Sequence, residues 1–146
     1  ELGLSGNLTQ RWTMFTGLSL MDGSIQESLV AAEVDRRLSY VPQQSFNLWS
    51  TYRLPREISV GFGAQFTGGY YFTNTNALTT ANADAIQQLT RYWLFSAMAS
   101  HRFNDHLELQ LNLSNLANER YVERGYTGHF VPGPGRSVLV TPVIRF

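Results

Sequence analysis

Residues 107–114 read Leu-Glu-Leu-Gln-Leu-Asn-Leu-Ser, with a leucine at every odd position and a polar residue at every even one. Because successive side chains of a β-strand point to opposite faces, this alternation predicts a strand with one apolar and one polar face. An amphipathic helix would instead repeat its apolar residues three and four positions apart. The stretch therefore predicts a β-strand rather than a helix.

The same period of two recurs in seven successive segments, each with apolar residues on one face and mostly polar residues on the other. This repetition predicts an all-β chain. The segments are 2–8, 11–26, 45–54, 58–72, 91–103, 106–121 and 136–146.

The connections between these segments alternate in length. Three are turns of two or three residues, near 9–10, 55–57 and 104–105. The other three are links of 14 to 18 residues, at 27–44, 73–90 and 122–135. Short turns at one end and long loops at the other are typical of transmembrane β-barrels. Several segments exceed the roughly 9–11 residues that cross a bilayer as a tilted strand, and we expect 11–26, 58–72 and 106–121 to project beyond the membrane.

Composition excludes several classes of function. The chain carries 11 basic and 11 acidic residues, so no net positive charge favours a nucleic-acid partner. It has no cysteine, which excludes disulfides and thiol-based sites. The chain contains no run of 18 apolar residues, so it has no predicted transmembrane helix. The three histidines, His101, His106 and His129, are too far apart in the expected barrel to predict a metal site, and no Ser-His-Asp arrangement indicates catalysis.

A one-sided apolar pattern on every strand needs an apolar partner. In a soluble sandwich that partner would be a second sheet. In a membrane barrel lipid takes this role, and the polar faces line a wet lumen. Aromatic residues near the expected strand ends favour the membrane, since such rings prefer its interfaces. Those near the short turns are Trp12, Tyr52, Phe103 and Phe146, and those near the long loops are Tyr70, Tyr71, Phe72, Tyr92, Trp93 and Tyr121.

Four strings resemble, in order, motifs of TonB-dependent outer-membrane siderophore receptors. They are VPQQSFNLW at 41–49, YWLFSAMASHRF at 92–103, LQLNLSNLANERY at 109–121 and VPGPGRS at 131–137. The resemblance covers nearly the whole chain, and the catecholate-type branch is the most similar. Ser96, His101 and Ile144 depart from residues that are frequent in the family.

The resemblance implies an antiparallel transmembrane β-barrel of about 22 strands, closed around a plug domain. We expect residues 1–146 to form about seven C-terminal strands of it, without the plug and the earlier strands. The implied function is TonB-dependent import of a ferric siderophore, of catecholate type, across the bacterial outer membrane. Such import is not enzymatic. It requires no cofactor in the chain, because the Fe(III)-siderophore is the cargo.

The implied partners are the remaining strands and the plug of the same receptor, the TonB–ExbB–ExbD complex acting through the plug, the barrel assembly machinery and outer-membrane lipid. Phe146, at the end of an alternating strand, resembles the signal that the assembly machinery recognises. Three alternatives stay open. They are a TonB-dependent receptor for cobalamin or haem, a passive porin or adhesin barrel, and a soluble β-sandwich binding module.

Two sets of site residues follow from the resemblance. A ferric catecholate is anionic and aromatic, so arginines and aromatic rings near the outer loops are candidate ligand contacts. They are Tyr71, Phe72, Arg91, Trp93, Arg120, Arg124, Tyr126 and His129, with the group at 124–129 preferred. The alternative is that these are solvated loop residues. The second set is expected to face the plug from the lumen, namely Arg53, Arg102, Glu108, Gln110 and Asn112.

Overall fold

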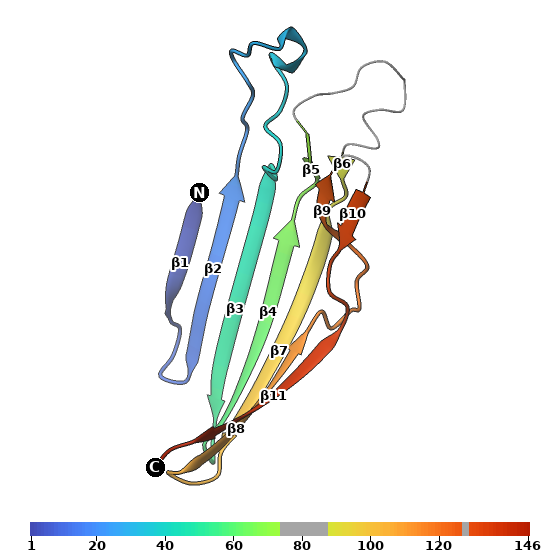
Figure 1. Cartoon of the computed structure of the whole chain (residues 1–146). Helices are drawn as coiled ribbons and strands as arrows, with labels where there is room; N and C mark the ends of the chain where they lie inside the picture. The colour runs from blue at the N-terminus through green and yellow to red at the C-terminus, as the bar shows by residue number, and fades with distance from the viewer. Residues whose placement is uncertain (74–87, 127–128) are drawn as a thin grey trace.

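Seven antiparallel strands form one tall, curved sheet in the computed structural model, which describes residues 1–73, 88–126 and 129–146 (Figure 1). The strands lie side by side in the order in which they occur along the chain, and β1 and β11 form the two edges of the sheet. Its strands are β1 (Leu2–Asn7), β2 (Trp12–Leu20), β3 (Gln44–Leu54), β4 (Ile58–Thr67), β7 (Tyr92–Arg102), β8 (Leu107–Ser114) and β11 (Ser137–Ile144). The predicted seven-stranded antiparallel segment is confirmed.

The remaining elements lie beyond one end of this sheet. They are η1 (Ala31–Glu33), the pair formed by β5 (Tyr70–Tyr71) and β6 (Gln88–Leu89), and the hairpin formed by β9 (Val122–Tyr126) and β10 (His129–Pro132). Among the residues that the structure describes, no helix is long and apolar enough to cross a bilayer.

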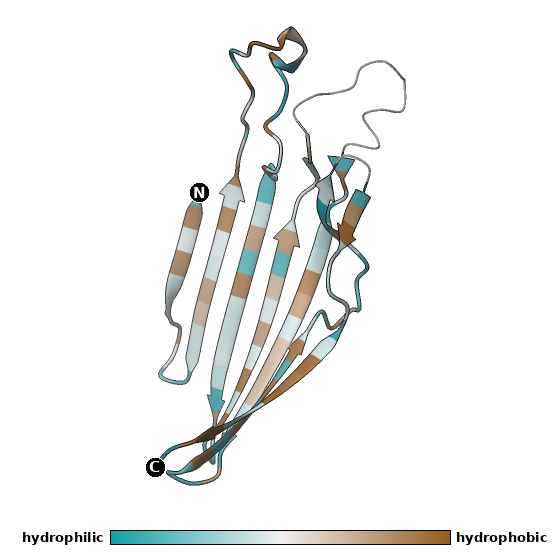
Figure 2. Ribbon diagram, in the orientation of Figure 1, coloured by the Kyte–Doolittle hydropathy of each residue, from teal (hydrophilic) through white to brown (hydrophobic). Residues whose placement is uncertain are grey.

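The strand register gathers most of the apolar residues of the seven strands on one face. Leu111 of β8, for example, lies opposite Ala99 of β7 and Val140 of β11, and directly opposed residues share a face. Figure 2 shows the result as hydrophobic bands that alternate along the strands. This apolar face includes Leu2, Leu4, Trp12, Leu18, Phe46, Leu48, Tyr52, Val60, Phe62, Phe66, Trp93, Phe95, Leu107, Leu109, Leu111, Leu113, Val138, Val140 and Ile144.

No second sheet packs on the apolar face within the described strands. Leu107 and Leu109 remain 38% and 40% exposed, and Phe62 remains 44% exposed. A soluble β-sandwich would bury these side chains between two sheets. The uncovered apolar face therefore favours lipid as its surroundings.

The opposite face is polar, but less uniformly than the sequence suggested. Phe15, Leu94, Met98, Leu139 and Val143 all lie on it, among serines, threonines, asparagines and charged residues. We call this the polar face.

Trp49 also lies on the polar face, and two glycines of β4 accommodate its ring. A Cβ atom at Gly63 would come within 2.7 Å of the indole, and one at Gly61 within 2.9 Å. The glycines therefore let the indole lie close to the backbone of the neighbouring strand.

Three strands end earlier than predicted. β2 ends at Leu20, because its pairing with β3 stops after the bond from Met21 N to Gln43 O, 2.8 Å. β4 ends at Thr67, and the last bond of its pairing with β3 runs from Gly68 N to Gln44 O, 2.8 Å. β8 ends at Ser114, because the next residue leaves extended geometry, as described below. The predicted projections at 11–26, 58–72 and 106–121 are thus not continuous strands.

Candidate functional site

The hydrophobic core found in the described residues lies at the long-loop end of the molecule, beyond the sheet. Tyr70 and Phe72 are 8% exposed and Leu89 is 3% exposed, and Val122 packs against them. These residues come from the β5–β6 pair, from the residue after β5 and from β9, so one cluster joins two long links that are distant in sequence (Figure 1). The cluster also corrects the expected interfacial role of Tyr70 and Phe72, because both rings are buried among loop residues.

Hydrogen bonds between loops hold this cluster in place. The Tyr40 hydroxyl donates to the Gly125 carbonyl oxygen at 2.7 Å, and the Tyr70 hydroxyl donates to the Glu123 carbonyl oxygen at 2.8 Å. The Tyr40 amide also donates to the Tyr71 carbonyl oxygen at 2.7 Å. Three long links of the chain are therefore bonded to one another.

The β9–β10 hairpin packs closely against Phe72. A Cβ atom at Gly125 would come within 2.8 Å of the Phe72 ring, so glycine permits the contact. On the other strand of the hairpin, Phe130 meets Phe72 edge-on, with ring centroids 5.6 Å apart. Aromatic edge-to-face pairs are favourable beyond their buried area. Phe72 thus packs against both strands of the hairpin.

Asn115 fixes the segment that leads from β8 into this hairpin. It is 5% exposed and adopts a left-handed φ of 50°. Its side-chain amide donates to the carbonyl oxygens of Glu119 at 2.9 Å and Pro134 at 3.0 Å, and its Oδ1 accepts from the Glu119 amide at 2.8 Å. Asn115 lies within the motif at 109–121, but nothing in the pattern of that motif indicates this role.

Tyr121 follows Asn115 in this segment. Its ring contacts Gly133 and lies against Tyr92, with centroids 4.3 Å apart. Tyr92 is on the polar face of β7, opposite Thr67, which corrects its expected place in a lipid-facing aromatic belt.

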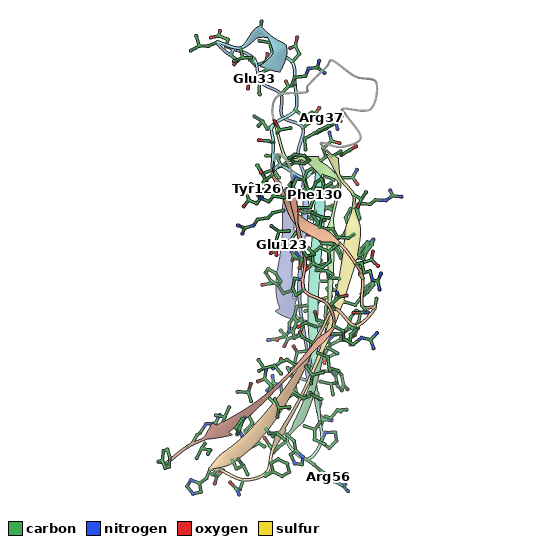
Figure 3. All side chains as sticks on the ribbon, turned by 45° about the vertical axis from the view of Figure 1, so that its right-hand side comes forward. Glu33, Arg37, Arg56, Glu123, Tyr126 and Phe130 are labelled. Atoms are coloured by element: carbon green, nitrogen blue, oxygen red, sulfur yellow. The ribbon has the colours of Figure 1, made fainter. Side chains whose placement is uncertain are left out.

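The preferred ligand group is brought together on the β9–β10 hairpin. Tyr126 stacks on His129 with centroids 5.2 Å apart, and a hydrogen bond with Tyr126 raises the pKa of Arg124. All three side chains are exposed. Figure 3 shows Tyr126 beside Phe130 and Glu123 at the long-loop end, far from Arg56 at the other end. The intervening residues 127–128 lie outside the described part of the chain.

The other candidate contacts are dispersed. Phe72 is buried beneath the hairpin, and Trp93 lies on the apolar face against Phe66, with centroids 4.9 Å apart. Arg91 and Arg120 are exposed on separate segments. Tyr71 is half-buried and lines a cleft of about 180 Å³ with residues 35–37, which lie far from it in sequence.

Burial raises the pKa of Tyr70, and the nearby Tyr92 and Tyr40 raise it further. The phenol is neutral below its ordinary pKa of 10.0, and its contribution to loop stability is fully present there. As the pH rises through the folded pKa, the phenolate replaces the O–H donor to Glu123 and the contribution is lost.

We therefore expect protease cleavage in the long loops to increase above about pH 10, in the range where Tyr70 ionises. Limited proteolysis at a series of pH values measures this. Tyr70→Phe should be cleaved faster at neutral pH and should show a smaller increase at high pH. An unchanged pH profile in that variant would contradict the assignment to Tyr70.

The expected plug-facing residues all lie on the polar face. Glu108 pairs with Arg145 at 3.1 Å and with Arg102 at 3.9 Å, while Gln110 donates to Asn112 at 3.0 Å. Arg53 lies farther along the same face, toward β2.

The histidines are separate, as expected from their spacing. His101 is on the apolar face and stacks on Phe103 at 4.4 Å, and His106 contacts the Arg145 carbonyl oxygen at 3.0 Å. His129 is at the opposite end, on β10. In the residues that the structure describes, no three His, Cys, Asp or Glu side chains are grouped to hold a metal ion.

Comparison with known proteins assigns this architecture to a family. The family model described as "TonB dependent receptor-like, beta-barrel" matches residues 1–116, which include β1 to β8. The chain belongs to the TonB-dependent receptor barrels. Receptors of this family are outer-membrane proteins of Gram-negative bacteria that contain a plug domain and interact with TonB. The apolar face is therefore the lipid face of this barrel wall, and the polar face lines its lumen.

Individual TonB-dependent receptors align over nearly the whole chain. The probable TonB-dependent receptor BfrD of Bordetella pertussis is 34% identical over 143 residues, which cover 97% of this chain and 19% of BfrD. The catecholate siderophore receptor Fiu of Escherichia coli strain UTI89 is 33% identical over 152 residues, which cover 100% of this chain and 19% of Fiu. The crystal structure of the ferric-catecholate import receptor Fiu from E. coli K12, in its closed form, has a TM-score of 0.83 at 28% identity, covering 99% of this chain and 20% of that one. The chain thus spans about a fifth of the length of the curated relatives it matches.

Proposed function

We propose that this chain forms part of an outer-membrane receptor that imports a ferric siderophore of catecholate type into the periplasm. The observation that carries the proposal is the group formed by Arg124, Tyr126 and His129 on the β9–β10 hairpin. A cationic guanidinium beside two stacked rings suits an anionic complex with aromatic ligands. The name of the similar receptor Fiu, a catecholate siderophore receptor, supports the same cargo. Import of this kind is non-enzymatic and uses the Fe(III)-siderophore as cargo rather than as cofactor.

The hairpin is suited to a binding role because it is supported rather than free. Tyr40, Tyr70 and Phe72 hold it from two other loops, so its exposed side chains are presented from a fixed backbone. A pre-organised site loses less conformational entropy when the ligand binds. We place Arg91, Arg120 and Tyr71 outside the central group, because they lie on separate segments.

We propose that the other parts and partners of the receptor are arranged as in other members of the family. The lipid face lies against outer-membrane lipid, and other strands of the same receptor pair with the edges β1 and β11. The plug fills the lumen beside Arg53, Arg102, Glu108, Gln110 and Asn112, and the TonB–ExbB–ExbD complex acts through the plug. Phe146 serves the barrel assembly machinery.

The test is uptake of iron-labelled ferric catecholate by cells that produce the complete receptor. We expect energy-dependent uptake of this cargo, and no comparable uptake of cobalamin or haem. Ion conductance without energy coupling would instead indicate a passive pore.

Arg124→Gln should weaken binding of the ferric catecholate about tenfold, because one charge-assisted contact is worth roughly 1.5 kcal/mol. Equilibrium binding to de-energised cells measures this. Arg136→Gln is the matched control, since Arg136 is also exposed but lies outside the hairpin. Equal affinities for the two variants would remove Arg124 from the site.

A further inference from the structure

An apolar patch lies midway along the polar face, among side chains that are mostly hydrophilic. It consists of Phe15 of β2, Trp49 of β3, and Leu94 and Met98 of β7, and we call these four residues the lumen patch. Phe15 is 54% exposed and Trp49 is 37% exposed. Apolar side chains left in water are unfavourable, and exposed apolar patches with a polar rim mark sites of protein contact.

The strand register joins the lumen patch into one surface. Phe15 lies directly opposite Trp49, and the indole of Trp49 extends over Gly61 and Gly63 of the next strand. A Cβ atom at Gly61 would lie 2.9 Å from the indole and 3.5 Å from Cε of Met98, so these two side chains border the same position. Glycine in the interior of a strand often marks a close approach by another group. Here the two glycines hold the indole close against the wall.

A small cleft opens beside this indole. It is lined by Trp49, Leu94, Gly63 and Ser96, among others, and its volume is about 160 Å³. Sites for small molecules measure roughly 300–1,000 Å³. The cleft is below that range and has the size for one inserted side chain of another protein segment.

The sheet itself limits what can cover the lumen patch. β2, β3, β4 and β7 are each flanked on both sides by another strand of this chain, so further strands of the wall pair only at the edges β1 and β11 (Figure 1). Lipid lies against the opposite face. The covering segment must therefore come from inside the lumen, and receptors of this family contain a plug domain.

We propose that an apolar segment of the plug packs on the lumen patch and inserts one side chain into the cleft beside Trp49. This contact is separate from the charged and amide contacts proposed above for the plug. Apolar interface centres that contain tryptophan contribute most of the binding energy in protein interfaces, and hydrated polar contacts contribute less. The lumen patch therefore holds the plug against this part of the wall. The inference rests on the proposed arrangement of wall and plug, but not on the identity of the cargo.

The first test is photo-crosslinking of the complete receptor in outer membranes. Three variants carry p-benzoylphenylalanine in place of Phe15, Gln110 or Phe62. Gln110 is a proposed plug-facing residue, and Phe62 is an aromatic residue of β4 on the lipid face. After irradiation and digestion, mass spectrometry identifies the linked peptides. We expect the probe at position 15 to link to an apolar peptide of the plug, and the probe at position 62 to link to no plug peptide.

The probe positions separate two kinds of failure. Plug links from position 110 without any from position 15 would overturn the contact at the lumen patch alone. If neither position links to the plug, the proposed arrangement of wall and plug is wrong, and the inference is overturned with it.

The second test uses Trp49→Ala in the complete receptor. Protease should cleave the plug about tenfold faster than in wild type, the loss expected when a central aromatic residue of an interface is truncated. Trp49→Phe should restore most of the protection. Phe62→Ala truncates a ring on the lipid face of the next strand and should leave the cleavage rate unchanged. Rates are compared at equal receptor quantity in the outer membrane.

Unchanged cleavage of the plug in Trp49→Ala would overturn the proposal. A lower uptake rate of the cargo in that same variant would then assign the lumen patch to the route of the cargo instead of to the plug.

Discussion

Replacing Leu111 with arginine should lower the free energy of unfolding by about 2–4 kcal/mol, the cost of a cation on the lipid face near the middle of the bilayer. Leu111 occupies the middle of β8 and lies between Ala99 and Val140 on the apolar face. The guanidinium would have to leave water for hydrocarbon. Denaturant titration of the complete receptor in phospholipid vesicles, followed by tryptophan fluorescence, measures the change.

The neighbouring position supplies the control. Gln110 is one residue away on the same strand but lies on the lumen face. Gln110→Arg should therefore change the free energy of unfolding by only about 0.5 kcal/mol, as is usual for polar surface substitutions. Similar costs at both positions would mean that the two faces of β8 share one environment, and the lipid-facing arrangement of the sheet would be wrong.

The strands could be predicted because one physical requirement acts on each of them. Lipid on one side and water on the other impose an alternation that is visible in residues 107–114 without any neighbouring strand. The register then follows, because a shift by one residue would turn Leu109 and Leu111 toward the lumen. Trp49 was less predictable. Its place on the lumen face depends on the glycines of another strand, Gly61 and Gly63, and no pattern within β3 reveals that contact.

The loop site was harder to predict, since its contacts join residues that are far apart in the chain. Arg124, Tyr126 and His129 could be chosen by their chemistry and do lie on one hairpin. Phe72 was chosen for the same reason, but its ring is used for packing. Tyr40 gave no signal in sequence, because its role is a hydrogen bond to a backbone 85 residues later.

The strongest effect expected in the loops comes from Asn115→Ala. The substitution removes three side-chain hydrogen bonds, leaves the carbonyl oxygens of Glu119 and Pro134 without that donor, and places alanine at a φ of 50°. Each hydrogen bond contributes about 1 kcal/mol and the left-handed backbone costs about another 1 kcal/mol, so the segment should be destabilised by roughly 3–4 kcal/mol. Proteolysis within residues 116–136 and hydrogen exchange of their amides measure this opening.

Two further variants separate the causes. Asn115→Gly loses the same hydrogen bonds but tolerates the backbone angle, so it should be less damaging than alanine by about 1 kcal/mol. Asn112→Ala, on the lumen face of β8, should leave the loop protected because its side chain bonds only toward Gln110 among the contacts seen in β8. Since the hairpin with Arg124 and Tyr126 follows Asn115, the alanine variant should also bind the ferric catecholate more weakly than wild type. A protected loop and wild-type affinity in Asn115→Ala would show that the hairpin is held by the Tyr40, Tyr70 and Phe72 contacts alone.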